Sequence, residues 1–166
     1  MTCFTLVTEC ELVVLNKIQI FGGIKMEDYT ISECNNVESD LLVDKIVEYN
    51  LSIVPSKQEI NFLWINRAIE DINGEIIAGI LSKMYCWNCL YIDVLWVKGE
   101  HRKDGLGTKL LTEIEKIAIE KGCHLIHLDT FDFQAKDFYI KHGYEIFGVL
   151  DECPQGHTRY YMKKHI

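Results

Sequence analysis

A basic turn that contains two glycines lies near the middle of the chain, between an apolar segment and an amphipathic one. It includes Arg102, Gly105 and Gly107, which combine a positive side chain with residues that let a ligand approach the backbone closely. The first amides of a helix have no acceptor within the helix, and the helix dipole adds positive potential there. A turn of this kind in front of a helix predicts a phosphate-binding site.

The segments on either side supply the required strand and helix. After the turn, apolar residues recur at intervals of three and four, while lysines and glutamates take the other positions, which predicts an amphipathic helix. The apolar positions are Leu106, Leu110, Leu111, Ile114, Ile117 and Ala118. Tyr91 to Val97 reads as an apolar strand, so the turn should join the end of a strand to a helix N-terminus.

Two motifs in this region resemble the GNAT-type N-acetyltransferase family. The family signature is Arg or Gln, two residues, Gly, one residue, then Gly or Ala, and here it reads Arg102, Lys103, Asp104, Gly105, Leu106 and Gly107. A later family motif is matched by Ala135, Tyr139, Gly143 and Tyr144. The resemblance implies an α/β (α+β) fold: a twisted, mostly antiparallel mixed sheet flanked by helices.

The resemblance also implies acetyl-coenzyme A as acetyl donor, with its pyrophosphate bound by the turn from Arg102 to Thr108. Trp96 and Val97, at the end of the preceding strand, are expected to offer main-chain hydrogen bonds to the acetyl and pantetheine part. The chain departs from the family at two positions. Asp104 replaces a basic or polar residue and should repel phosphate, and Asp132, also expected at the cofactor, replaces a common asparagine.

Acetyl transfer to an amine needs a proton donor for the leaving sulfur and a base for the amine. The resemblance implies that Tyr139 is the donor, and a phenol with a pKa near ~10 is protonated at neutral pH. For the base, strand alternation places Asp93 on one face with apolar neighbours, and Asp129 is an equal rival as base or as an anchor for a cationic acceptor. Either carboxylate could instead form a structural ion pair.

The composition limits the protein's partners. With 166 residues and 48% hydrophobic residues, the chain can bury the core of one domain. A formal net charge of −8 argues against binding to nucleic acid or an anionic membrane. Seven cysteines without a secretory leader indicate reduced thiols and a cytoplasmic protein. The expected acceptor is therefore a small cationic or neutral amine, and a homodimer is left open.

Read in order, residues 1–25 are an N-terminal extension or an extra strand, and residues 26–166 a single acetyltransferase domain. Glu27 to Cys34 is expected to be a strand and Ser39 to Tyr49 a helix. An antiparallel meander follows, with a tight turn at Asn73 and Gly74. After the central helix come a parallel strand to Phe131, a short helix and two further strands (His124 to Phe131, Ala135 to His142, Tyr144 to Leu150, Arg159 to Lys164).

Other kinds of site are less well supported. Cys86 and Cys89 form a CxxC pair, but no second pair with similar spacing accompanies it, so we expect free thiols and no metal. The favoured function is acetyl transfer from acetyl-coenzyme A to the primary amine of an unidentified acceptor, directly within a ternary complex. The alternative is a non-catalytic acyl-CoA-binding or regulatory module, which Tyr139 opposes and Asp104 favours.

Overall fold

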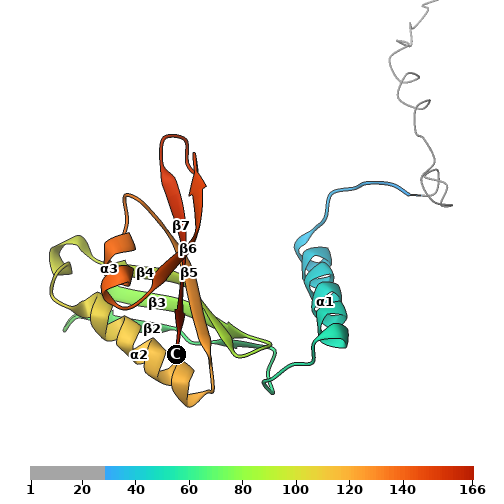
Figure 1. Ribbon diagram of the computed structural model, residues 1–166, viewed down its shortest axis with the longest axis horizontal. Coiled ribbons are helices and arrows are strands. Elements are labelled where there is room, and N and C mark those ends of the chain that lie inside the picture. Colours follow the sequence, from blue (N-terminus) through green and yellow to red (C-terminus); the bar gives the residue numbers. More distant parts are fainter. Residues whose placement is uncertain (1–28) are drawn as a thin grey trace, which may run out of the picture. The chain divides into compact units, whose positions relative to one another are not determined.

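The computed structural model of the protein describes residues 29–166 (Figure 1). The described residues divide into two units, one that ends at Ile46 and one that runs from Val47 to Ile166. The predicted extension over residues 1–25 lies outside the described residues. The prediction of a strand from Glu27 to Cys34 is wrong for its described part, because residues 29–35 form neither helix nor strand.

Helix α1 (Asn36–Ile53) starts before the predicted Ser39 and runs past Tyr49. Its early start has a local cause in Asn35. The Glu38 amide donates a hydrogen bond to the Asn35 side-chain oxygen (3.1 Å), and the Asn35 amide donates to the Glu38 carboxylate (2.8 Å). This reciprocal pair is a capping box, which satisfies two amides at a helix start.

The second unit is built on a seven-stranded sheet of order β1-β3-β4-β5-β7-β6, with β2 also paired to β3. Only β4 and β5 pair in parallel, and every other neighbouring pair of strands is antiparallel. The predicted mixed, mostly antiparallel sheet is confirmed. The strands are β1 (Phe62–Trp64), β2 (Arg67–Glu70), β3 (Ile76–Tyr85), β4 (Cys89–Val97), β5 (Leu125–Phe131), β6 (Glu145–Asp151) and β7 (Thr158–His165).

Helices α2 (Leu106–Glu120) and α3 (Lys136–Lys141) supply the helical side of the core. Figure 1 shows α2 lying along one face of the sheet. Its inward residues Leu110, Leu111, Ile114 and Ala118 are buried, as their spacing predicts. They pack with Ile80, Leu90, Ile126 and Leu128 of the sheet. Each fully buried leucine or isoleucine side chain contributes about 1.5–3 kcal/mol to the free energy of folding. This interface therefore holds α2 and its N-terminus on the sheet.

Two irregularities of β4 shape the surroundings of that helix. Residue Leu81 of β3 pairs with Val94 and Ser82 pairs with Ile92, so Asp93 is the extra residue of a β-bulge. The ladder between β4 and β5 ends at Ile92, although β4 continues to residue 97 and β5 to residue 131. We call residues 93–97 and 129–131 the unpaired ends of β4 and β5, because they do not pair with each other.

Candidate functional site

The unpaired end of β4 exposes main-chain groups on its β5 side. The Lys98 amide donates to the carbonyl of Ile77, towards β3 (2.9 Å). Since successive amides point to opposite sides of a strand, the amides of Val97 and Leu95 point away from β3, towards the β5 side. The amide of Val97 therefore faces the side of β4 where a donor is predicted to bind, whereas the amide of Trp96 points towards β3. The amide of Leu95 faces the same side as that of Val97, and the sequence prediction did not include it.

The turn that follows has the geometry of an anion site. Gly105 is the N-cap of α2 in a left-handed conformation (φ 82°), which glycine adopts without a steric penalty. The Lys109 amide donates to the Gly105 carbonyl (3.0 Å), so the preceding amides, of residues 106–108, have no acceptor one turn back. A Cβ on Gly107 would lie 3.6 Å from the Phe138 ring, while one on Gly105 would meet no atom within 4 Å.

The basic residues of the turn differ in what they contact. Arg102 is exposed, and its Nε donates to the Val97 carbonyl (3.3 Å), which links the turn to the strand end. Lys103 is exposed with a positive φ of 76°. The Thr108 hydroxyl lies 3.2 Å from Nε2 of His142, just beyond α3. The N-terminus of α2 is thereby tied both to β4 and to the segment that follows α3.

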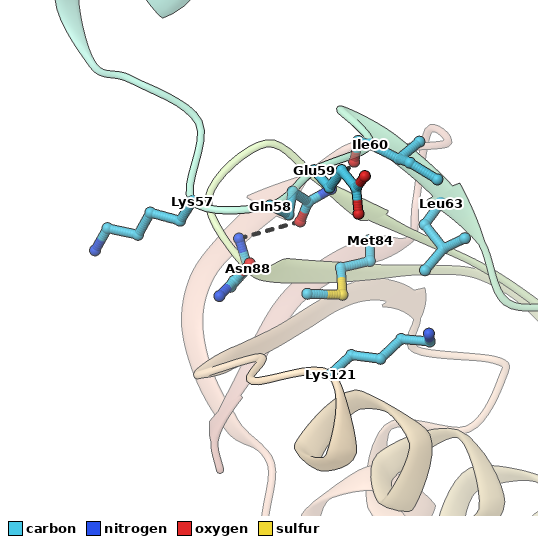
Figure 2. A pocket seen from close by; sticks show the side chains of 8 residues that line it. All are labelled: Lys57, Gln58, Glu59, Ile60, Leu63, Met84, Asn88 and Lys121. Carbon is cyan, nitrogen blue, oxygen red and sulfur yellow. Dashed lines mark hydrogen bonds between the residues drawn. The ribbon is translucent and has the colours of Figure 1, made fainter.

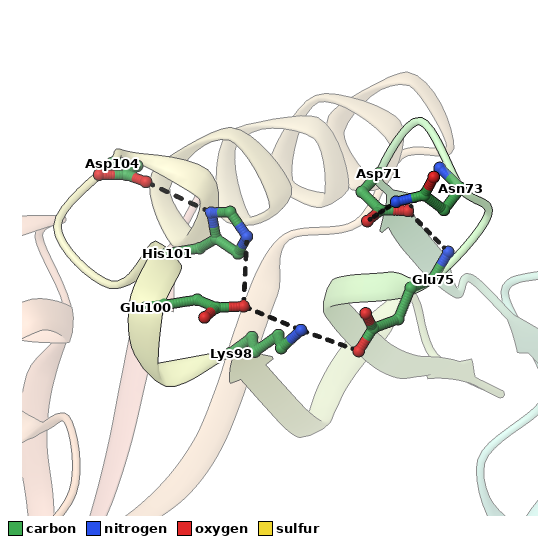
Figure 3. A network of polar contacts seen from close by, with 7 residues as sticks. All are labelled: Asp71, Asn73, Glu75, Lys98, Glu100, His101 and Asp104. Atoms are coloured by element: carbon green, nitrogen blue, oxygen red, sulfur yellow. Dashed lines mark hydrogen bonds and ion pairs between the residues drawn. The ribbon is translucent and has the colours of Figure 1, made fainter.

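Asp104 belongs to a polar network beside the turn, shown in Figure 3. Its carboxylate is 3.5 Å from Nδ1 of His101, whose other ring nitrogen is 3.9 Å from Glu100. Lys98 contacts Glu100 and Glu75 at 2.9 Å each, and these carboxylates raise the pKa of Lys98 while Lys98 lowers that of Glu100. Asp104 thus contacts His101 at the edge of the turn that is predicted to bind phosphate.

Tyr139 occupies the inward face of α3 and is 5% exposed. Its ring makes edge contacts with Phe138 and Tyr144, at centroid distances of 5.3 and 5.6 Å. Burial, and then the negative charge of Asp129, raise the pKa of Tyr139 to about 12. The hydroxyl is thus neutral at physiological pH and able to donate, and it lies close enough to the end of β5 to sense Asp129.

The two predicted bases have different surroundings. Asp93 is exposed at the bulge, so the predicted apolar environment is wrong: the bulge breaks the strict alternation on which that prediction rested. Asp129 accepts hydrogen bonds from Tyr91 (2.9 Å) and from Nε of Arg159 (2.6 Å). Burial, and then Asp129, raise the pKa of Tyr91 to about 12. Asp129 therefore forms the structural ion pair that was the alternative to a catalytic role.

Asp132 is placed beside a residue that the sequence prediction missed. Its two carboxylate oxygens lie 3.1 and 3.3 Å from Nδ1 of His157, in the loop between β6 and β7. No local pattern points to this pair, because 25 positions separate its members and only the pairing of β5 with β7 brings them together. His127 is different: it contacts the Tyr85 hydroxyl at 2.8 Å, and burial lowers its pKa.

A pocket of about 280 Å³ lies away from these residues, near the β3–β4 turn and the end of α2 (Figure 2). It contains none of the predicted site residues. Its lining consists of Lys57, Gln58, Glu59, Ile60, Leu63, Met84, Asn88 and Lys121. Cys86 and Cys89, close to the same turn, are free buried thiols whose pKa is raised by burial.

Within residues 29–166 no group of three side chains is arranged to hold a metal ion. The same part of the chain contains no helix with the length and apolar character needed to cross a bilayer.

Comparison with known proteins agrees with this geometry. Residues 30–144 match the Acetyltransferase (GNAT) family. The chain belongs to this family. As a GNAT member it is an acyltransferase, with acetyl-coenzyme A as its acetyl donor. The expected family, enzyme class and donor are confirmed, and the alternative of a non-catalytic module is not favoured.

Individual relatives cover different parts of the chain. Blasticidin-S acetyltransferase of Streptomyces morookaense is 34% identical over 94 residues, which are 56% of this chain and 68% of that protein. A crystal structure of an acetyltransferase from Bacillus cereus ATCC 14579 is 38% identical, with a TM-score of 0.76 over 83% of this chain and 98% of that one. An aminoglycoside 6'-N-acetyltransferase complexed with coenzyme A shares the fold, at 21% identity and a TM-score of 0.54 over 79% and 92% of the two chains.

Proposed function

We propose that this GNAT protein transfers the acetyl group of acetyl-coenzyme A directly to the primary amine of a small molecule, within a ternary complex. The observation that carries the proposal is the buried, neutral hydroxyl of Tyr139 on α3, close enough to the end of β5 to be affected by the charge of Asp129. The N-terminus of α2 follows this same end of β4 after a short turn, and it suits the pyrophosphate of the donor. The donor would then be bound by the turn at its pyrophosphate and by the strand end at its thioester.

The residues present fit the donor. The amides of residues 106–108 and the positive charges of Arg102 and Lys103 are suited to the pyrophosphate. Gly105 leaves space for close approach, while Asp104 weakens the positive potential. The main-chain amides of Leu95 and Val97 would bind the pantetheine and acetyl carbonyl, which polarises the carbonyl for attack.

Bound there, the thioester supplies an activated acetyl group. Tyr139 would give its proton to the sulfur as the carbon–sulfur bond breaks, which a phenol kept neutral by burial can do. Asp129 would remain paired with Arg159. Asp93, exposed at the bulge, would attract the positively charged acceptor.

For the acceptor we propose a small cationic amine. The net charge of −8 favours a cation, and blasticidin S is the first compound to test, because a relative with 34% identity carries its name. An aminoglycoside is the second, although that relationship is one of fold.

The test combines two measurements on the full chain. Calorimetry should show binding of coenzyme A, and incubation of acetyl-coenzyme A with each amine should release free coenzyme A in step with acetylated product identified by mass spectrometry. Binding of coenzyme A without any acetylated amine would refute the proposed acceptor class. Release of coenzyme A without acetylated product would show hydrolysis in place of transfer.

A further inference from the structure

The contact between His157 and Asp132 defines the state of the imidazole. A carboxylate only accepts hydrogen bonds, and both of its oxygens lie near Nδ1, at 3.1 and 3.3 Å. Nδ1 is therefore the nitrogen that carries the proton in the neutral ring, and Nε2 keeps its lone pair. The His157 side chain is 47% exposed, so a small molecule can reach the ring.

The pair is fixed at the end of β5. Asp132 follows Phe131, the last residue of that strand, and its amide donates to the carbonyl of Thr158, the first residue of β7 (2.9 Å). The Phe133 ring makes an edge contact with His157 at 4.9 Å and stacks on Phe131 at 5.2 Å. These contacts hold the imidazole beside the unpaired end of β5, the same strand end whose Asp129 acts on Tyr139.

Other candidates for removing the amine proton are less suitable. Asp129 is hydrogen-bonded by Tyr91 and paired with Arg159. Asp93 is exposed at the bulge, where it is better placed to attract a cationic acceptor than to take up its proton. An imidazole, by contrast, is the side chain that most often serves as a general base, and Nε2 of His157 is left without a proton by the contact of Nδ1 with Asp132.

We propose that His157 is the general base for the acceptor amine and that Asp132 is its positioning residue. The inference rests on the proposed function. As the amine nitrogen bonds to the acetyl carbon and the carbon–sulfur bond breaks, the surplus proton on nitrogen passes to Nε2 of His157. The sulfur receives the proton of Tyr139, and both residues return to their starting states by exchange with solvent.

This role accounts for the aspartate at position 132, where the family commonly has asparagine. An amide would offer one neutral oxygen to Nδ1. A carboxylate orients the ring and also stabilises the imidazolium formed when Nε2 takes up a proton, as in other histidine–aspartate pairs.

The first test uses the pH dependence of turnover with blasticidin S as the probe. His157→Asn keeps a donor for Asp132 and removes Nε2, and should lower kcat/KM for the amine by about 10²-fold or more. The loss of activity towards acid pH should disappear, while the KM for acetyl-coenzyme A stays unchanged. His165→Gln, at the exposed far end of β7, and Asp93→Asn should both keep the acid limb. The proposal is overturned if the activity of His157→Asn still falls towards acid pH, or if the activity of Asp93→Asn no longer does.

The second test does not depend on turnover. Nitrogen-15 NMR of the imidazole side chains reports which ring nitrogen is protonated, and at pH 8 wild-type His157 should show the Nδ1-protonated form. Asp132→Ala should shift the ring towards the Nε2-protonated form. A wild-type ring already protonated at Nε2 overturns the proposal. If the wild type acetylates no amine, the proposed function fails. The spectrum still reports the protonated nitrogen of His157 in that case, so the two failures can be told apart.

Discussion

Replacement of Tyr139 by phenylalanine is the most direct test of the proposed chemistry. The substitution removes one hydroxyl and keeps the ring, whose edge contacts with Phe138 and Tyr144 at 5.3 and 5.6 Å do not involve that oxygen. The melting temperature and the affinity for coenzyme A should therefore remain close to those of the wild type.

The expected loss lies in the chemical step. General acid catalysis typically contributes about 10²- to 10⁴-fold in rate, equivalent to about 3–5 kcal/mol of barrier. Tyr139 must be protonated to act, and its pKa of about 12 means that it stays protonated throughout the range from pH 6 to 10. An alkaline decline of wild-type activity below pH 10 would thus belong to another group.

The assay is single-turnover acetylation with saturating acetyl-coenzyme A, which separates chemistry from product release. Tyr144→Phe is the matched control: this neighbouring ring is 3% exposed, and its buried hydroxyl makes no hydrogen bond of good geometry in the described part of the chain, although burial, and then the nearby Glu115, raise its pKa. Removing that oxygen should leave the rate unchanged and stability equal or higher. A full single-turnover rate in Tyr139→Phe, with fold and coenzyme A binding intact, would refute the assignment of the proton donor.

Three further predictions concern the turn and the buried tyrosines. Gly105→Ala should lower the free energy of unfolding by about 1–2 kcal/mol, because alanine is strained in the left-handed backbone of this position, and it should weaken coenzyme A binding. Gly107→Ala should be tolerated, since its Cβ would meet only ordinary contacts. Equal coenzyme A affinities by calorimetry and equal melting temperatures for the two variants would contradict this prediction. Asp104→Lys should tighten coenzyme A binding at low salt, and the gain should fade as salt screens the charge; no gain at low ionic strength would contradict it. Burial raises the pKa of four tyrosines in the folded state above the unfolded value near ~10. These tyrosines should therefore contribute fully to the free energy of unfolding below pH 10 and progressively less above it. Denaturant titrations at pH 9 and 11 can measure the difference. The tyrosines concerned are Tyr85, Tyr91 and Tyr139, with pKa values of about 12, and Tyr144, shifted in the same direction.

Much of the site follows from local sequence patterns. The three-and-four spacing from Leu106 to Ala118 predicts α2 and its buried face, and Gly105 marks the turn that starts the helix. These features are determined by residues close in sequence, whose preferences for helix, strand or turn act over a few positions.

The remainder depends on contacts between distant residues. The bulge at Asp93 changes the phase of β4, so Leu90 and Ile92 face the core before it and Leu95 and Val97 after it. Strict alternation cannot anticipate an inserted residue.

The same limit applies to polar partners. Asp129 pairs with Arg159 and Asp132 with His157, and no residue close in sequence to either aspartate predicts these partners. The antiparallel ladder between β5 and β7 brings the side chains together.

The short ladder between β4 and β5 has a consequence for how the folded chain opens. Only four residue pairs, Cys89 to Ile92 with Leu125 to Leu128, join the two halves of the sheet, and each half is continuous in sequence. Amide hydrogen exchange should therefore reveal two cooperative units, with β1–β4 and β5–β7 opening separately at a lower free energy than global unfolding. A donor bound to both halves would couple these units, slow exchange in both together and raise the melting temperature in proportion to the logarithm of its concentration.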